Sequence, residues 1–252
     1  MRHRSGIVGV FPPPFTITDD LPDPLIPPRE APWQAGFRAV RANLWPGLAV
    51  QTIMAVTVVT YLTVPSSHAA FDALAMLKER WGYVYSAVAA MIAGAFIPEA
   101  LRVIAFQKGR VTRRNFGNLV FAACFWGYGG MQVDLLYRLQ GEWFGNDPDL
   151  AVVLKKILVD QFLYCPLIAC PQSVILYDWR RSGFAREKMS GFFTVSFYRN
   201  AIIPALFATW GVWIPIVAAI YSLPGPLQIP LFSLALSLWV ILFTWMSEQR
   251  SH

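Results

Sequence analysis

Long uncharged stretches separated by short charged ones set the pattern of this chain. The longest runs from residue 200 to 247 without Asp, Glu, Lys or Arg. As one straight helix it would be about 72 Å long at roughly 1.5 Å per residue, more than twice the ~30 Å of a bilayer core. It must therefore fold back, and Pro224, Gly225 and Pro226 suit a tight turn. This stretch predicts two transmembrane helices joined by a short hairpin.

Four further uncharged runs have the length of a membrane span. They cover residues 42–71, 81–98, 115–133 and 161–177. In lipid only a helix or a closed barrel satisfies the backbone, and these runs lack the alternating polarity of barrel strands. We therefore predict an all-α, polytopic transmembrane helix bundle with about six spans. The expected spans are 45–64, 82–104, 115–138, 157–177, 200–222 and 227–246.

Residues outside the spans form a tail and two surface segments. The N-terminal tail, residues 1–44, is rich in proline, so we expect an extended segment that precedes the helical domain of residues 45–252. It could act as a flexible linker or lie across a neighbouring subunit. Segments 67–81 and 185–199 mix charged and apolar positions, which predicts amphipathic helices at the two membrane surfaces.

Composition and charge agree with a membrane protein and orient it. Hydrophobic residues make up 56% and charged residues 14%, and the mean hydropathy is +0.44. The net charge of +6 reflects basic residues concentrated in the tail, in 107–114 and in 178–199, all on one side of the predicted bundle. The positive-inside rule places both termini on the matrix or cytoplasmic side. We interpret the basic excess as orientation, with no nucleic-acid partner.

The usual catalytic and cofactor groups are missing from the predicted spans. Cys124, Cys165 and Cys170 are an odd, membrane-buried set, which is neither a disulfide framework nor a good metal chelate. The three histidines lie outside the spans, so no haem ligand or proton shuttle is expected in the core. The sequence also lacks a phosphate-binding loop and a nucleophile elbow. We predict no enzyme activity, cofactor or metal. An enzyme embedded in the membrane is the third hypothesis, after the scaffold and the channel described below.

A few ionisable residues at the ends of the spans are the candidate functional site. A charge at a helix centre costs about 2.5–3.5 kcal/mol, so each should face a partner or water. Glu99 and Arg102, three apart, share a helix face towards the inner side. An outer polar cluster is predicted from Asp134, Arg138, Lys156, Asp160 and Gln161. The cluster either fixes helix register as a polar clasp or forms a pore mouth or solute site.

Two other groups of residues have alternative interpretations. Arg113, Arg114, Arg180 and Arg181 on the inner face could bind anionic lipid head groups such as cardiolipin, or could serve as topology determinants alone. Trp210 and Trp213 lie inside a span. They either pack between helices or form a platform for a ligand.

One short motif resembles a known family. Lys156, followed by Asp160-Gln161 and then by Pro166, is similar to the signature of the Mpv/PMP family of peroxisomal and mitochondrial inner-membrane proteins. The similarity extends over roughly residues 81–252. Its other elements are Arg113-Arg114, Gly129-Gly130 with Tyr137, Trp210 with Trp213-Ile214-Pro215, and Tyr221-Ser222-Leu223-Pro224. Ile216 and Ala219 stand where the family usually has amides, which disfavours a water-filled channel.

The resemblance implies a multi-span organellar membrane protein. The uncharged helices and the additional tail and first span point in the same direction. Together they favour a non-catalytic accessory or scaffold subunit of a mitochondrial inner-membrane assembly of respiratory type. Its expected partners are lipids and other membrane subunits. The alternative is a small-solute channel or membrane-homeostasis protein acting alone. A peroxisomal or a bacterial cytoplasmic membrane would be compatible with the same charge pattern.

Overall fold

The chain forms a bundle of helices. The computed structural model describes residues 31–251, and within that range it contains helices and no strand. Five of its helices are long and apolar enough to cross a membrane: Leu44–Thr63, Tyr83–Phe106, Arg113–Phe144, Val195–Tyr221 and Gly225–Leu242. The predicted all-helical membrane fold is therefore confirmed at this level. The proline-rich segment of residues 1–30 lies outside the described residues.

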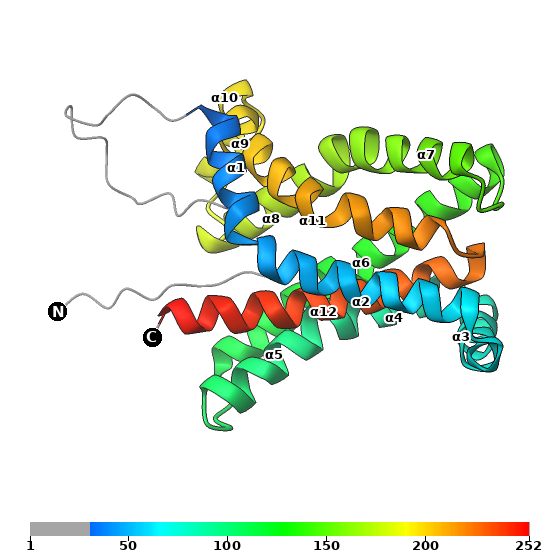
Figure 1. The fold of residues 1–252 in the computed structure, drawn as a ribbon. Coiled ribbons are helices and arrows are strands. Elements are labelled where there is room, and N and C mark those ends of the chain that lie inside the picture. The colour runs from blue at the N-terminus through cyan, green and yellow to red at the C-terminus, as the bar shows by residue number, and fades with distance from the viewer. Residues whose placement is uncertain (1–30, 252) are drawn as a thin grey trace.

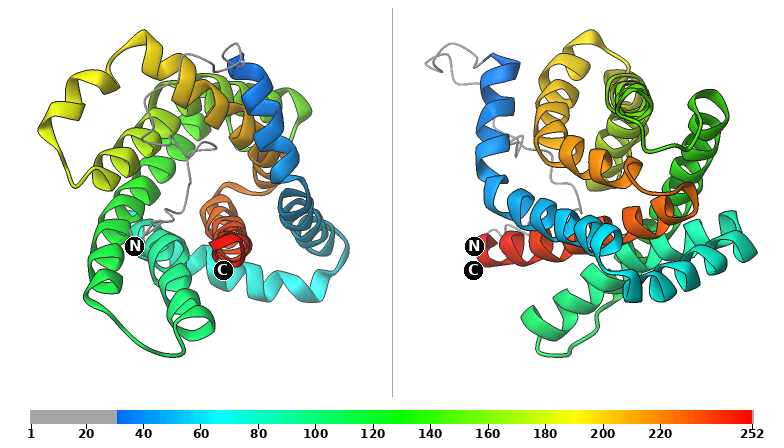
Figure 2. Two further views of the ribbon diagram at one scale, coloured as in Figure 1. Left: turned by 90° about the vertical axis from the view of Figure 1, so that its left-hand side faces the viewer. Right: turned by 45° about the vertical axis from the view of Figure 1, so that its right-hand side comes forward.

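The first helices bend sharply twice. α1 (Pro32–Ala42) begins with a proline at its first position and ends at Asn43, where the chain turns into α2 (Leu44–Thr63). After the short turn η1 (Pro65–Ser67), α3 (His68–Trp81) lies across one end of the bundle (Figures 1 and 2). Gly82 separates α3 from the next helix with φ +52°, a backbone conformation that suits glycine. The segment predicted as a surface helix, 67–81, is thus helical from residue 68 to 81.

The second and third long helices form an antiparallel pair. The second runs through α4 (Tyr83–Met91), the π-helix η2 (Ile92–Phe96), α5 (Ile97–Leu101) and the π-helix η3 (Arg102–Phe106). α6 (Arg113–Phe144) follows, capped by the Thr112 side chain. The predicted span 115–138 lies inside α6, which is longer at both ends. Asp134 and Arg138 do not end α6, because both charges are neutralised by partners within the protein.

The fourth helical run is continuous but changes its winding. α7 (Leu150–Val159) passes into a ten-residue π-helix, η4 (Asp160–Ala169), and then into α8 (Cys170–Arg181). The predicted span 157–177 lies inside this run. It contains the charged residues Lys155, Lys156 and Asp160.

The last part of the chain supplies the centre of the core. The segment predicted as an inner surface helix forms η5 (Arg186–Lys188), α9 (Met189–Phe192), α10 (Val195–Phe197) and the start of the π-helix η6 (Tyr198–Ile202). α11 (Ile203–Tyr221) and α12 (Gly225–Ser251) form the predicted hairpin. Pro226 lies in the first turn of α12, where a missing N–H has no cost. Ile216, Ile220 and Leu236 of this hairpin are fully buried.

The start of α1 and the end of α12 lie at the same end of the bundle (Figure 1). α3 lies across the opposite end. Figure 2 shows α6, α8, α11 and α12 surrounding the interior of the bundle. This arrangement positions the cavity described next.

Candidate functional site

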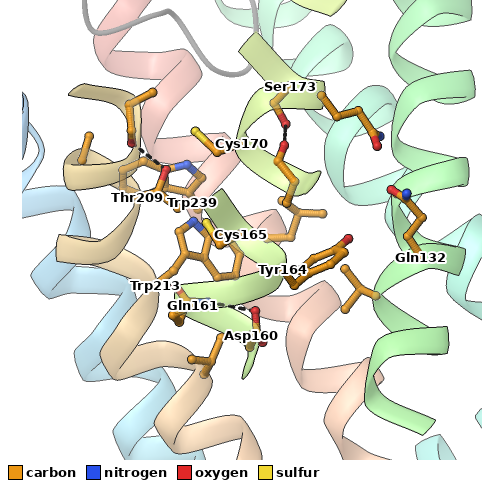
Figure 3. A pocket seen from close by; sticks show the side chains of 18 of the residues that line it. Gln132, Asp160, Gln161, Tyr164, Cys165, Cys170, Ser173, Thr209, Trp213 and Trp239 are labelled. Atoms are coloured by element: carbon orange, nitrogen blue, oxygen red, sulfur yellow. Dashed lines mark hydrogen bonds between the residues drawn. The ribbon is translucent and has the colours of Figure 1, made fainter. Parts of the chain in front are cut away.

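A cavity of about 420 Å³ lies within the helical bundle. Its walls come from α6, η4, α8, α11 and α12, with the end of α1 at one edge (Figure 3). Ligand pockets in proteins have volumes of about 300–1,000 Å³, so the space is large enough for a small organic molecule. Small side chains create this space, because Ala39, Ala42, Gly129, Ala205 and Ala208 line it where larger residues would fill it.

The cavity wall combines aromatic rings with a few polar groups. The aromatic residues that line it are Phe125, Trp126, Tyr137, Tyr164, Tyr177, Trp213, Phe232 and Trp239. The uncharged polar residues are Asn43, Gln132, Gln161, Gln172, Ser173 and Thr209. Asp160 is the one charged residue among the described residues of the lining. The site therefore has an apolar body and a single negative group.

Asp160 is held in place by two donors. The Tyr221 hydroxyl donates to Asp160 Oδ2 at 2.6 Å, and Gln161 Nε2 donates to Asp160 Oδ1 at 3.0 Å. Asp160 is 6% exposed, and within the described part of the chain no Lys, Arg or His nitrogen lies within 4.0 Å of it. The carboxylate thus lies in the cavity wall without a cation in contact.

Lys156, one turn before Asp160, is directed elsewhere. Its ammonium group donates to Asn146 Oδ1 at 3.2 Å and lies 5.7 Å from the centre of the Tyr221 ring. Lys156 is 1% exposed and does not line the cavity. Tyr221 therefore lies between the two charges of this motif, with its ring towards the lysine and its hydroxyl on the carboxylate.

Two prolines shape the wall that carries Asp160. In a π-helix the N–H of residue i bonds to the carbonyl of residue i−5, so Pro166 leaves the Gln161 carbonyl without its donor, and Pro171 does the same to the Pro166 carbonyl. Trp210 Nε1 donates to the Gln161 carbonyl at 2.7 Å, and the Tyr198 hydroxyl donates to the Pro166 carbonyl at 3.1 Å. Side chains of η6 and α11 thus replace both missing backbone donors.

Of the two tryptophans singled out in the sequence, Trp210 serves as a hydrogen-bond donor between helices. Trp213 lines the cavity next to Cys165 (Figure 3). The cavity also includes Cys170, whereas Cys124 is exposed on the bundle surface.

The outer part of the predicted cluster forms a separate site away from the cavity. Asp134 accepts from Lys78 Nζ at 2.9 Å, from Ser86 Oγ at 2.6 Å and from Arg138 Nε at 3.0 Å. Arg138 also lies over the Tyr83 ring, 4.6 Å from its centre. Asp134 is 2% exposed and Lys78 6%. This site, which we call the Asp134 clasp, ties α3 and α4 to α6.

The inner pair is also neutralised. Arg102 donates to Glu99 Oε2, and Asn115 Nδ2 donates to Glu99 Oε1. Asn115 in turn accepts from the Thr112 backbone at the start of α6. Glu99 therefore fixes the second helix against the cap of the third, and neither Glu99 nor Arg102 lines the cavity.

The predicted outer cluster is thus divided. The structure brings Asp134 and Arg138 together in one group. Asp160 and Gln161, with Lys156 nearby, form a second group. No hydrogen bond or ion pair among the described residues joins the two groups. A polar path from Asp160 and Asp134 to Glu99, as a pore would need, is not formed, because two of the three carboxylates are paired with cations outside the cavity.

The inner arginines are partly engaged by the chain itself. Arg180 donates to Asn118 Oδ1 at 2.6 Å and lies over the Phe121 ring, 4.4 Å from its centre. Arg181 pairs with Asp178 at 2.6 Å. Arg113 and Arg114 are exposed in the first turn of α6.

Several residues of these sites were not identified from the sequence. Lys78 and Ser86 complete the Asp134 clasp, and Tyr221 and Tyr137, whose rings lie 5.0 Å apart, flank Asp160. Tyr221 could have been suspected as a site residue, because it belongs to one of the motifs that resemble the Mpv/PMP family. Lys78 had no such signal, since its charge is ordinary for a surface helix.

Comparison of the chain with protein-family models, with curated proteins and with solved structures returned no match. The resemblance to the Mpv/PMP family therefore depends on the motif residues alone. Among these, hydrogen bonds join Asp160, Gln161, Trp210 and Tyr221, and Lys156 lies 5.7 Å from the centre of the Tyr221 ring.

Proposed function

We propose that this chain is a non-catalytic, polytopic membrane protein that binds a small solute in the cavity between α6, η4, α8, α11 and α12. One observation carries the proposal: the buried Asp160 carboxylate lies in the cavity wall without a cation within 4.0 Å among the described residues. This is the second of the two functions expected from the sequence, with a binding cavity in place of an open pore.

The contrast with the other buried carboxylates supports this choice. Asp134 and Glu99 are each paired with at least one basic side chain, as expected for groups that only stabilise the fold. Charged groups at membrane depth are costly and are found where they face a partner or a pathway. A carboxylate that faces a cavity of about 420 Å³ suits the second situation.

The membrane arrangement is part of the proposal. We infer six spans, which are the five apolar helices and the run from Leu150 to Arg181. We place both termini on the matrix or cytoplasmic side. Gln161, Gln172 and Ser173, three polar residues of this run, line the cavity and so need not face lipid. The resemblance to the Mpv/PMP family favours the mitochondrial inner membrane.

Binding can be tested on the purified full chain in detergent. Thermal unfolding is followed with a panel of small cationic, neutral and anionic solutes. At least one class should raise the midpoint, because a ligand that binds only the folded state stabilises it. Thr209→Trp, which places a large ring in the cavity, should abolish the shift, and Trp143→Phe, an exposed position, should not. No shift with any class, together with no solute flux in proteoliposomes, would overturn the proposal.

A scaffold or accessory subunit is the second candidate. The observation that favours it is the exposure of α2. Only 28% of the apolar part of this helix is buried, the lowest share among the five apolar helices. Val56, Val59 and Leu62 on its outer face are exposed in the isolated chain. Native electrophoresis of mildly solubilised membranes tests this function: migration with a large assembly supports it, and migration as a free monomer contradicts it.

A further inference from the structure

The chemistry of the cavity also indicates which class of solute it takes, an inference that rests on the proposed function. The Asp160 end of the cavity presents acceptors in excess of donors. A carboxylate has about four acceptor positions, and Asp160 uses two of them for Tyr221 and Gln161. Gln161 Oε1 is buried without a hydrogen-bond partner among the described residues, and Gln161 is 4% exposed. A buried acceptor without a donor is costly, so a ligand that donates hydrogen bonds here would be favoured.

The charge of the lining selects a positive ligand. Asp160 contributes the one formal charge among the described lining residues, and none of these is Lys, Arg or His. An anion would meet the carboxylate with no compensating cation among the described lining residues, whereas a cation would complete an ion pair with this buried carboxylate. Coulomb interactions are several times stronger in such surroundings than in bulk water.

The size and walls of the cavity select an organic cation over a metal ion. No group of three or more His, Cys, Asp and Glu residues that could hold a metal occurs in the part of the chain searched, which is residues 31–251. The volume of about 420 Å³ exceeds what a bare ion needs. Aromatic residues such as Tyr137, Trp213 and Phe232 attract cations through their faces and bury apolar groups well.

We propose that the cavity binds a primary or secondary ammonium ion with an apolar body. The ammonium group lies between Asp160 and the free oxygen of Gln161, and the apolar body lies along the aromatic wall towards Trp239. Figure 3 shows Asp160 and Gln161 together at one end of the cavity, with Trp213 of α11 and Trp239 of α12 farther along it.

The test uses four probes of similar shape on the purified full chain in detergent, by isothermal titration calorimetry. 2-Phenylethylamine carries the ammonium group. Its trimethylated derivative keeps the charge without N–H donors, 2-phenylethanol is neutral, and 3-phenylpropionate is anionic. We expect 2-phenylethylamine to bind at least tenfold more tightly than the other three, because it alone satisfies both the charge and the free acceptors.

Variants connect this preference to the residues. Asp160→Asn should weaken 2-phenylethylamine binding at least tenfold and should leave 2-phenylethanol binding within a factor of about two. Asp178→Asn, outside the cavity, is the matched control and should change neither. The comparison of probes on the unmodified chain needs no variant, so a misfolded Asp160→Asn protein would not prevent a decision.

The outcomes separate this inference from the proposed function. Equal binding of the amine and the alcohol, or tighter binding of 3-phenylpropionate, would overturn the cation class and leave a solute-binding cavity in place. If the trimethylated derivative bound as tightly as 2-phenylethylamine, the hydrogen-bonding role of Gln161 and Asp160 would be overturned. If no probe bound, and no other small solute shifted thermal unfolding, the proposed function would fail together with this inference.

Discussion

At the scale of single residues, the Asp134 clasp shows what a buried charge does when it is not needed for a ligand. Asp134 is contacted by Lys78, Arg138 and Ser86, three donors from three helices. Removing one partner of a buried pair leaves the other uncompensated, and this costs more than the pair itself contributes. The clasp should therefore determine whether α3 stays attached to the bundle.

Asp134→Asn should lower the free energy of unfolding by about 3–5 kcal/mol, because Lys78 would be left buried without its carboxylate. The measurement is chemical or thermal unfolding of the detergent-solubilised chain. Asp178→Asn is the control, since its pair with Arg181 is more exposed and is expected to contribute about 0–1 kcal/mol. The double variant Lys78→Met/Asp134→Leu should recover much of the loss. Equal effects of the two single variants would contradict this account.

Adjacent glycines of α6 allow a second comparison at this scale. A Cβ at Gly130 would overlap the Ser86 backbone oxygen and lie 2.6 Å from the Ala90 Cβ, whereas nothing lies within 4 Å of a Cβ at Gly129. Gly130→Ala should therefore destabilise the chain by about 1–3 kcal/mol through overpacking of α4 on α6. Gly129→Ala should stabilise it by about 0.5–1 kcal/mol through helix propensity. Unfolding midpoints that shift in the same direction would refute the proposed close contact.

At the scale of elements, the helices were largely predictable, while their winding was not. Uncharged stretches determine where helices can cross lipid, so α2, α11 and α12 lie within a few residues of their predicted ranges. The π-helix η4 depends on donors from Trp210 and Tyr198, which are distant in the sequence. The same limit applies to the site: Asp160 and Gln161 were recognisable by type, but the pairing of Asp134 with Lys78 arises from helix packing.

The support of η4 can be tested through Trp210. Trp210→Phe removes the donor to the Gln161 carbonyl and keeps an aromatic ring, so it should cost about 1–3 kcal/mol of stability, the penalty of a buried acceptor without a partner. Because the carbonyl belongs to a cavity residue, binding of any ligand at Asp160 should weaken as well. Thermal unfolding and calorimetry of the same preparation measure both effects. Trp143→Phe, at an exposed tryptophan, should leave both unchanged.

At the scale of the whole molecule, the position of Leu150–Arg181 relative to the membrane decides where the cavity lies. This run would span about 48 Å at 1.5 Å per residue, enough to cross a bilayer core of ~30 Å. Its polar residues Asp160, Gln161 and Ser173 belong to the cavity wall. If it crosses, the cavity is enclosed at membrane depth, and its one carboxylate is isolated from bulk water by the spans around it.

Single cysteines at Arg110, Lys155 and Arg186, all exposed, can locate this run, in a background where Cys124, Cys165 and Cys170 are replaced by alanine. In sealed proteoliposomes a membrane-impermeant maleimide should label positions 110 and 186 from one side and position 155 from the other. This pattern follows because α6 and the run from Leu150 to Arg181 would each cross once between these positions. Labelling of 155 and 186 from the same side would show that the run from Leu150 to Arg181 does not cross the membrane. Asp160 would then lie in a surface cavity, where water and not the bilayer determines the free-energy cost of burying its charge.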